Sequence, residues 1–234
     1  MIFRHITLIF TPSSSLCITI KPMKFDIKYS EEPPDSKIFT RSFDRFYSNF
    51  AKLYDAAIKI LPWWKTCLNQ SLPYIQGPRV LEVSFGTGYL LSRYAGNFFT
   101  CGIDYNRKMV ETARNNLQKH CQRAYLKQAD VEHLPYKDGS FDCIVSTMAF
   151  SGFPNGMRAM AEMVRVLKKG GRLILIDVNY PQDRNALGMM TALFWQKAGD
   201  LLRDMNTLFE AFNLEYTHRE IGLFGTVQLY VARK

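Results

Sequence analysis

Two acidic side chains and the glycine-rich stretch between them are the residues of this chain best suited to chemistry. Glu82 lies in a short apolar run that leads into the turn Ser84-Phe85-Gly86-Thr87-Gly88, and Asp104 ends a second apolar run. Without a Cβ, Gly86 and Gly88 allow positive φ and a close approach of a ligand to the backbone. A carboxylate at the end of the second strand of a Rossmann-like sheet can hold a ribose diol. The G-x-G-x-x-G spacing and a following Gly-Lys-Ser/Thr are both absent, which disfavours a phosphate-cradling loop.

These residues need a strand, a tight turn and a helix to position them. The pattern predicts five strands that alternate with helices, at residues 79–84, 99–104, 124–129, 141–147 and 172–178. The helix after the glycine turn begins near Leu90 and would direct free N–H groups and its positive dipole end at a ligand. Two further strands, 214–221 and 226–232, predict a terminal antiparallel hairpin. The alternation predicts an α/β fold with a parallel sheet and helices on both faces, and ligands bind at the carboxyl ends of the central strands.

Apolar spacing predicts the helices between these strands. Asn106 is a plausible N-cap for a helix that buries Met109, Val110, Ala113 and Leu117. A second apolar stripe, closed by Gly170, contains Met157, Met160, Val164 and Leu167. The apolar residues 186–195 are compatible with burial against the sheet, with a lid or with an interfacial patch, and core packing is the default.

At this point the chain resembles a family, the class I S-adenosylmethionine-dependent methyltransferases. The likeness covers roughly Tyr47 to the C-terminus and is to the small-molecule group that includes the ubiquinone/menaquinone biosynthesis C-methyltransferases. Five motifs follow in the family's order: Glu82 with the glycine turn, Asp104-Tyr105, Gln128-Ala129-Asp130-Val131, residues 141–145 and residues 164–173. The resemblance implies a Rossmann-like seven-stranded sheet of order 3-2-1-4-5-7-6, with the last strand antiparallel and helices on both faces.

The resemblance also implies S-adenosyl-L-methionine as the cofactor and assigns residues to it. The turn would pack against the methionine part, Asp104 would bind the ribose hydroxyls, Tyr105 would lie against the adenine, and Asp130 would accept from the adenine amino group. The implied cofactor-binding residues are Glu82, Ser84, Gly86, Gly88, Asp104, Tyr105, Asp130 and Val131. Ser84 departs from the family, which usually has glycine there.

The organisation we expect is an N-terminal extension and linker at residues 1–37 and a methyltransferase domain at residues 38–234. Within it, residues 38–76 form helices over the cofactor, and residues 179–212 form a helical insertion or lid. Residues 1–22 contain no acidic residue, and an organelle-targeting peptide or a start at Met23 explains them about equally well. Tyr47 and Tyr54 on the N-terminal helices are candidate catalytic residues, although core or rim aromatics of this kind are more common.

Composition bounds the remaining alternatives. Five cysteines without a C-x-x-C pair argue against a disulfide framework and a zinc site, so we expect no metal and a reducing, cytoplasmic location unless residues 1–22 target an organelle. Cys101 and Cys143 fall in predicted strands and are expected to be buried. The apolar runs are too short for a transmembrane helix. The net charge of +9 is dispersed, which suits solvated helix faces better than attraction to an anionic substrate, an acidic partner or an anionic membrane surface, and peripheral membrane contact stays an alternative.

Methyl transfer is an in-line displacement that depends on alignment, and it needs a general base only if the acceptor must lose a proton. Among the four histidines, His133 lies nearest a predicted strand end, although a plain loop histidine is the more common case. The fourth strand continues as Ser146-Thr147-Met148-Ala149-Phe150, which lacks the Asn/Asp-Pro-Pro-Tyr/Phe element of amino-directed DNA and glutamine methyltransferases and the Pro-Cys nucleophile of cytosine-C5 enzymes. Both absences count against nucleic-acid bases as the substrate. We therefore expect a methyltransferase for a small lipophilic or aromatic metabolite. The alternatives are a protein or RNA methyltransferase and a non-catalytic cofactor-binding subunit of a complex. The oligomeric state is left open.

Overall fold

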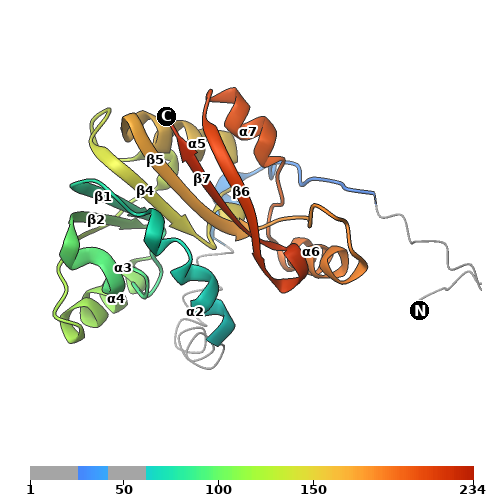
Figure 1. Ribbon diagram of the computed structural model, residues 1–234. Helices are drawn as coiled ribbons and strands as arrows, with labels where there is room; N and C mark the ends of the chain where they lie inside the picture. Colours follow the sequence, from blue (N-terminus) through green and yellow to red (C-terminus); the bar gives the residue numbers. More distant parts are fainter. Residues whose placement is uncertain (1–25, 42–61) are drawn as a thin grey trace, which may run out of the picture.

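One mixed β-sheet organises the computed structural model, which describes residues 26–41 and 62–234 (Figure 1). In the described residues its order is β3-β2-β1-β4-β5-β7-β6. The strands are β1 (Arg79–Val83), β2 (Phe99–Asp104), β3 (Tyr125–Gln128), β4 (Phe141–Thr147), β5 (Leu167–Val178), β6 (Glu215–Gly222) and β7 (Val227–Arg233). Strands β1 to β5 pair in parallel, and β7 runs antiparallel to both β5 and β6. The predicted fold class and strand order are confirmed.

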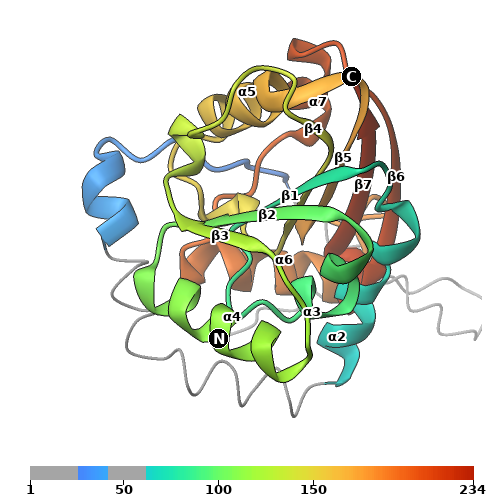
Figure 2. The same ribbon diagram turned by 90° about the vertical axis from the view of Figure 1, so that its left-hand side faces the viewer.

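Helices cover both faces of the sheet, as the two views together show (Figures 1 and 2). One face carries α5 (Gly156–Val166) and α7 (Met205–Ala211), and the other carries α2 (Pro62–Asn69), α3 (Leu91–Tyr94), α4 (Arg107–Lys119) and α6 (Ala186–Ala198). Short 3-10 turns connect them: η1 (Leu72–Tyr74), η2 (Ala95–Asn97), η3 (Val131–His133), η4 (Phe150–Gly152) and η5 (Leu223–Gly225). No helix in the described ranges is long and apolar enough to span a bilayer.

The central strand β4 shows how the sequence builds the two halves of the core. Because successive strand side chains point to opposite faces, Ile144 packs with the α5 and α7 side, whereas Cys143 and Val145 pack with the α4 and α6 side. Cys101 and Cys143 are buried, as predicted. The four cysteines in the described residues are free thiols.

Helix α4 begins where the sequence indicates. The Asn106 side chain accepts a hydrogen bond from the backbone N–H of Met109 over 3.1 Å, which satisfies one of the donors left open at the first turn. The predicted apolar face, Met109, Val110, Ala113 and Leu117, is buried against the sheet.

Helix α5 corrects the second predicted stripe. It ends at Val166, and Leu167 begins β5, so Gly170 lies within that strand instead of closing the helix. Met157 is 44 % exposed, and the buried face is formed by Gly156, Ala159, Met160, Met163 and Val166. Apolar residues occur on more than one side of this helix, and the side that contains Met163 packs against the sheet.

The helix after the glycine turn is short. Helix α3 has only four residues before the chain enters η2, so no dipole of a long helix points at the turn. Leu90 and Leu91 are buried, and the apolar run therefore serves the core.

A short N-terminal segment is tied to the far end of the chain. The backbone N–H of Ser30 donates to the carbonyl oxygen of Leu202 over 2.7 Å, and the Ser30 hydroxyl accepts from the N–H of Leu202 over 3.1 Å. Residues 36–41 are helical and lead into residues outside the described ranges.

Candidate functional site

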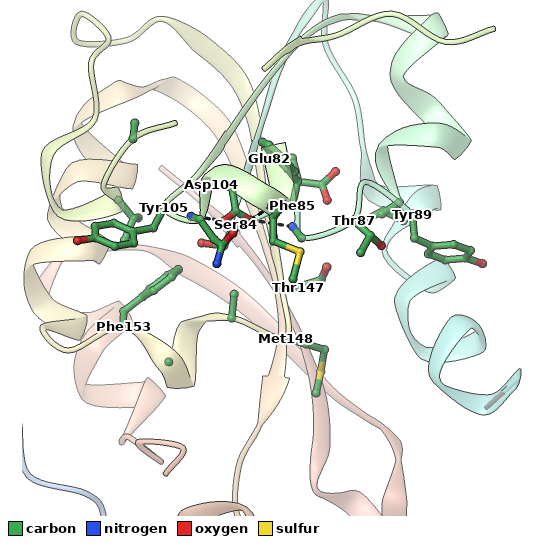
Figure 3. Close-up of a pocket in the computed structure, with 18 of the residues that line it drawn as sticks. Glu82, Ser84, Phe85, Thr87, Tyr89, Asp104, Tyr105, Thr147, Met148 and Phe153 are labelled. Atoms are coloured by element: carbon green, nitrogen blue, oxygen red, sulfur yellow. Dashed lines mark hydrogen bonds between the residues drawn. The ribbon is translucent and has the colours of Figure 1, made fainter. Parts of the chain in front are cut away.

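A cavity of about 190 Å³ lies at the carboxyl ends of β1, β2 and β4 (Figure 3). Strands β1 and β4 are neighbours in register, with Val83 beside Ser146, so the loops that follow them border the same space. Of the residues that the sequence assigned to the cofactor, seven line the cavity: Glu82, Ser84, Gly86, Asp104, Tyr105, Asp130 and Val131. Gly88, the eighth, is not among its lining residues.

The two turn glycines have different surroundings. Both have positive φ, +55° at Gly86 and +76° at Gly88. A Cβ added at Gly86 would meet no atom within 4 Å, whereas one at Gly88 would lie 2.9 Å from the Cβ of Ala113. Gly86 thus leaves the cavity open beside the backbone, and Gly88 lets α4 pack closely against the turn.

Ser84 keeps the backbone conformation of a glycine. Its φ is +55°, in the left-handed region that side chains disfavour. Its N–H donates to the carbonyl oxygen of Ile103 over 2.8 Å, which fixes the turn to the end of β2. Ser84 therefore adopts a conformation that glycine adopts more readily, which adds local strain.

Asp104 connects the end of β2 to the glycine turn. One carboxylate oxygen accepts from the N–H of Gly86 and the other from the N–H of Asn106, each over 2.9 Å (Figure 3). The side chain is 7 % exposed and lines the cavity. A carboxylate offers about four lone-pair positions, so it can accept further hydrogen bonds from a ligand.

Glu82 is buried between this turn and α3. Its Oε2 accepts a hydrogen bond from the Tyr94 hydroxyl over 2.7 Å, and the residue is 1 % exposed. Burial, together with the nearby charge of Asp104, raises the pKa of Glu82 to about 8, against the lowering effect of the Tyr94 hydrogen bond. A cationic ligand group would stabilise the ionised form of such a carboxyl.

The third predicted motif forms another part of the wall. Asp130 accepts from the N–H of Glu132 over 2.9 Å and so begins the short turn η3, in which Val131 is buried. Tyr105 is partly exposed at the cavity. The structure thus brings an aromatic ring, a carboxylate and an apolar side chain together around one cavity.

Of the catalytic candidates from the sequence, only His133 lies in the described residues, and it does not line this cavity. His133 has an exposed side chain, 3.9 Å from the carboxylate of Asp130 and in contact with Arg158, and it is not a lining residue. Tyr47 and Tyr54 lie outside the described residues. Within the described part of the chain, no group of three or more His, Cys, Asp or Glu side chains is placed to hold a metal ion.

The sequence reasoning missed the segment after β4. Met148 has a φ of +53° and donates its N–H to the carbonyl oxygen of Ile176, and its side chain lines the cavity with Thr147 and Phe153 (Figure 3). Trp64 and Leu68 from α2 line it as well. The pairing of neighbouring parallel strands could have indicated this segment, since ligands bind where their carboxyl ends meet.

A second missed feature is a pair of carboxyl groups, one of which lines the cavity. Asp200 is a lining residue, and its Oδ1 lies 2.8 Å from the hydroxyl of Ser151. The same hydroxyl lies 2.8 Å from Oδ1 of the buried Asp177. Burial, followed by the charge of Asp177, raises the pKa of Asp200 to about 6. No sequence motif indicated this arrangement.

The apolar segment 186–195 forms most of α6 and has two different faces. Met189 and Ala192 are buried in the core, as the default interpretation predicted. Leu187, Met190 and Phe194 are exposed, with Phe194 at 64 %. They recur at spacings of 3 and 4 and so share the outer side of the helix.

Comparisons with known proteins agree with this geometry. A family model described as a methyltransferase domain matches residues 81–175. A demethylmenaquinone methyltransferase from Thermotoga maritima is 28 % identical over 158 residues, which are 64 % of this chain and 67 % of that protein. A phosphatidylethanolamine N-methyltransferase from Cereibacter sphaeroides is 32 % identical over 114 residues, 48 % of this chain and 56 % of that protein. The chain thus spans about half to two thirds of the length of these two relatives.

Solved structures show the same fold. A methyltransferase dependent on S-adenosylmethionine from Thermotoga maritima superimposes with a TM-score of 0.66 at 19 % identity, over 81 % of this chain and 99 % of that one. The YcgJ protein of Bacillus subtilis gives a TM-score of 0.58 at 26 % identity, over 66 % and 70 % of the two chains. By fold, domain match and relatives, the chain resembles the class I S-adenosylmethionine-dependent methyltransferases, in particular the ubiquinone/menaquinone biosynthesis group, and this indicates S-adenosylmethionine as its cofactor.

Proposed function

We propose that the protein transfers the methyl group of S-adenosylmethionine to a small, lipophilic or aromatic metabolite. One observation carries the proposal: the glycine turn, two buried carboxyl groups and an apolar wall meet in a single cavity. The cofactor supplies an activated methyl group when it is bound. The protein's task is then to align the acceptor and to exclude water.

The residues present fit this cofactor. The open space beside Gly86 admits a ligand against the backbone, and the buried Glu82 favours a positively charged group nearby. We assign the ribose hydroxyls to Asp104, the adenine to Tyr105, Asp130 and Val131, and the methionine part to Glu82 and the turn. Gly88 supports this site through its packing on Ala113.

Part of the cavity wall suits a lipophilic acceptor. Met148 and Phe153 follow β4, and Trp64 faces the same space from α2. Methionine and aromatic side chains form adaptable apolar surfaces. The names of the relatives, demethylmenaquinone and phosphatidylethanolamine methyltransferases, are consistent with such an acceptor. The exposed apolar face of α6 offers a further contact surface for a lipophilic molecule or a membrane.

The proposed domain runs from residue 38 to 234. Residues 38–76 would cover the cofactor, and the described part of this range supports the assignment because Thr40, Trp64 and Leu68 line the cavity. Within residues 179–212, we propose a helical insertion in which α6 packs on one face of the sheet and α7 on the other. The free thiols of the described residues favour a reducing compartment, and we propose the cytoplasm.

Two measurements test the function in sequence. Isothermal titration with S-adenosylmethionine should show binding at one site per chain. Incubation with the methyl-labelled cofactor and an ultrafiltered cell extract should then give labelled small molecules. Label that appears only on macromolecules would contradict the metabolite acceptor, and binding without any transfer would favour a cofactor-binding subunit.

A further inference from the structure

The hydroxyl of Ser151 joins two carboxyl groups. Its Oγ lies 2.8 Å from Oδ1 of Asp177 and 2.8 Å from Oδ1 of Asp200. A serine hydroxyl has one proton, so it donates to only one of two carboxylates at a time. The second short contact becomes favourable when the other carboxyl carries a proton and donates it to the serine oxygen. The arrangement is therefore suited to holding one removable proton.

The surroundings decide which carboxyl holds that proton. Burial raises the pKa of Asp177 above its usual value. The hydrogen bonds that Asp177 accepts from the N–H of Ser151 over 2.9 Å and from the N–H of Val178 over 2.7 Å oppose this rise and favour its ionised form. For Asp200, the hydrogen-bond partner among the described side chains is the Ser151 hydroxyl. Its pKa, raised to about 6 by burial and by Asp177, leaves Asp200 as the carboxyl that exchanges its proton near neutral pH.

Charged side chains near the two carboxyl groups act on them differently. The Arg203 guanidinium is buried, donates to the carbonyl oxygens of Phe150, Phe153 and Pro154, and interacts electrostatically with Asp177. Asp177 on β5 is the charged group that acts on Asp200. Asp177 thus has a compensating cation, whereas Asp200 lines the cavity.

The backbone also fixes Asp200. Gly199, with a φ of +113°, ends α6, and the N–H of Asp200 donates to the carbonyl oxygen of Trp195 over 3.1 Å. The next N–H, of Leu201, donates to the carbonyl oxygen of Ser151 over 2.8 Å. The loop that carries the carboxyl is therefore held against η4, which follows the cavity wall of β4.

We propose that Asp200 is the general base that takes a proton from the methyl acceptor, with Ser151 and Asp177 as residues that position it. The proposal rests on the proposed function, because it assigns a role within the same cavity. It restricts the acceptor to one that must lose a proton to be methylated, such as a hydroxyl or an amine N–H, as opposed to a tertiary amine or a thioether.

The proton transfer balances in atoms and charge. The acceptor's O–H or N–H bond breaks, the proton binds the carboxylate of Asp200, and the electron pair stays on the acceptor. That pair forms the bond to the methyl carbon, while the methyl–sulfur bond of the sulfonium donor breaks toward sulfur. Carboxylate and sulfonium lose their charges together, and the proton leaves later through Asp200 to water.

The test compares wild type with Asp200→Asn and with a matched control, Glu210→Gln, an exposed acid on α7. Each is incubated with methyl-labelled S-adenosylmethionine and an ultrafiltered cell extract across pH 5–9. The wild-type rate should rise with pH around a midpoint near 6, the pKa to which burial and Asp177 raise Asp200. Asp200→Asn should lose at least about 100-fold in rate and the rise itself, since general bases contribute this much. The control should behave as wild type.

Two readouts do not depend on turnover. Titration calorimetry should show cofactor affinity in Asp200→Asn within about threefold of wild type. Carbon-13 NMR of protein labelled at aspartate carboxyls, without cofactor, should show a resonance with a midpoint near 6 that Asp200→Asn removes. Asp177→Asn should move that midpoint to lower pH, because the charge that raises the pKa of Asp200 is gone.

The outcomes separate the two proposals. If wild type binds the cofactor and forms no labelled small molecule, the proposed function fails and this inference falls with it. If wild type forms product and Asp200→Asn forms it equally fast with the same pH profile, only the base assignment is overturned. The absence of a carboxyl that titrates near pH 6 also overturns it.

Discussion

The carboxylate of Asp104 accepts a hydrogen bond from the backbone N–H of Gly86 across 2.9 Å. The end of β2 thereby holds the turn that follows β1, so the two parts of the proposed cofactor site are joined before any ligand arrives. A change at Asp104 should affect both the ribose contact and the shape of the turn.

Asp104→Ala should weaken S-adenosylmethionine binding. A lost charge-assisted acceptor is worth roughly 1.5–3 kcal/mol, or about 10-fold to 150-fold in affinity. Titration calorimetry measures the effect, with circular dichroism to check folding. Asp138→Ala is the matched control, because Asp138 is exposed and pairs with Arg165 at the surface. Equal affinities in the two folded variants would refute the ribose assignment.

Ser84→Gly should stabilise the protein slightly. Ser84 has a φ of +55°, and glycine removes the cost of the left-handed conformation, although its greater freedom in the unfolded chain offsets part of the gain. We expect an increase of up to about 1 kcal/mol in the free energy of unfolding, measured by urea denaturation. Ser92→Gly in α3 is the opposite control and should lose about 0.5–1 kcal/mol. A loss at both positions would contradict the strain at Ser84.

The two turn glycines should respond differently to alanine. Both variants incur strain from positive φ, but only Gly88→Ala forces a Cβ within 2.9 Å of Ala113. Gly88→Ala should therefore be less stable than Gly86→Ala by about 1–3 kcal/mol, the usual range for overpacking. The double variant with Ala113→Gly should recover part of this difference in urea denaturation.

For cofactor affinity, we expect Gly86→Ala to be the more strongly affected of the two variants, in contrast to their order in stability. The Cβ of Gly86→Ala extends toward the cavity, so this variant should bind S-adenosylmethionine more weakly than Gly88→Ala when both are folded. Calorimetry on the two proteins decides the point. Equal affinities would mean that Gly86 does not face the ligand.

Glu82 should make the stability of the cofactor-free protein fall with rising pH. Its pKa is about 8 in the folded state, above the usual value of 4.5. Between these values the folded protein keeps a proton that the unfolded chain releases, so stability is complete below pH 4.5 and is lost as the pH rises through 8. Glu82→Gln should remove this pH dependence. Tyr94→Phe should extend the fall to higher pH, because the hydrogen bond that lowers the pKa of Glu82 is lost.

Thermal unfolding from pH 5 to pH 9 measures the effect. Because burial of the ionised carboxyl is the cause, a bound cation should reduce it, and S-adenosylmethionine should stabilise wild type more at pH 9 than at pH 6. A wild-type profile parallel to that of Glu82→Gln would contradict the buried, titrating carboxyl.

The sequence predicted those features that local pattern determines. The alternation of strands and helices predicted a parallel sheet, and the family resemblance implied the strand order that the structure has. Asn106 marked the start of α4 because its cap is a local contact. Glu82 and Asp104 were found because they lie at the ends of apolar strands, and the turn because it follows the first of them directly. The buried face of α5 was predicted only in part: Met160 and Leu167 are buried as expected, but Met157 is exposed and Leu167 already belongs to β5. The apolar residues of the segment fit more than one stripe, and packing on the sheet chooses among them.

The carboxyl pair could not be found from the sequence. Ser151 lies 26 residues from Asp177 and 49 residues from Asp200, and only the crossing of the chain over the sheet brings the three together. Met148 was likewise passed over, because a left-handed backbone at a methionine has no sequence signature.

The hydrogen bonds between Ser30 and Leu202 have a practical consequence for anyone who shortens or tags this chain. Ser30 braces the stretch two residues after Asp200, although it lies far ahead of the sheet in the sequence. A chain that begins after Ser30 would lose the hydrogen bonds that hold the loop of Asp200, although every residue assigned to the cofactor would remain. A truncated protein that still captures the cofactor should consequently be judged on turnover before its start site is accepted.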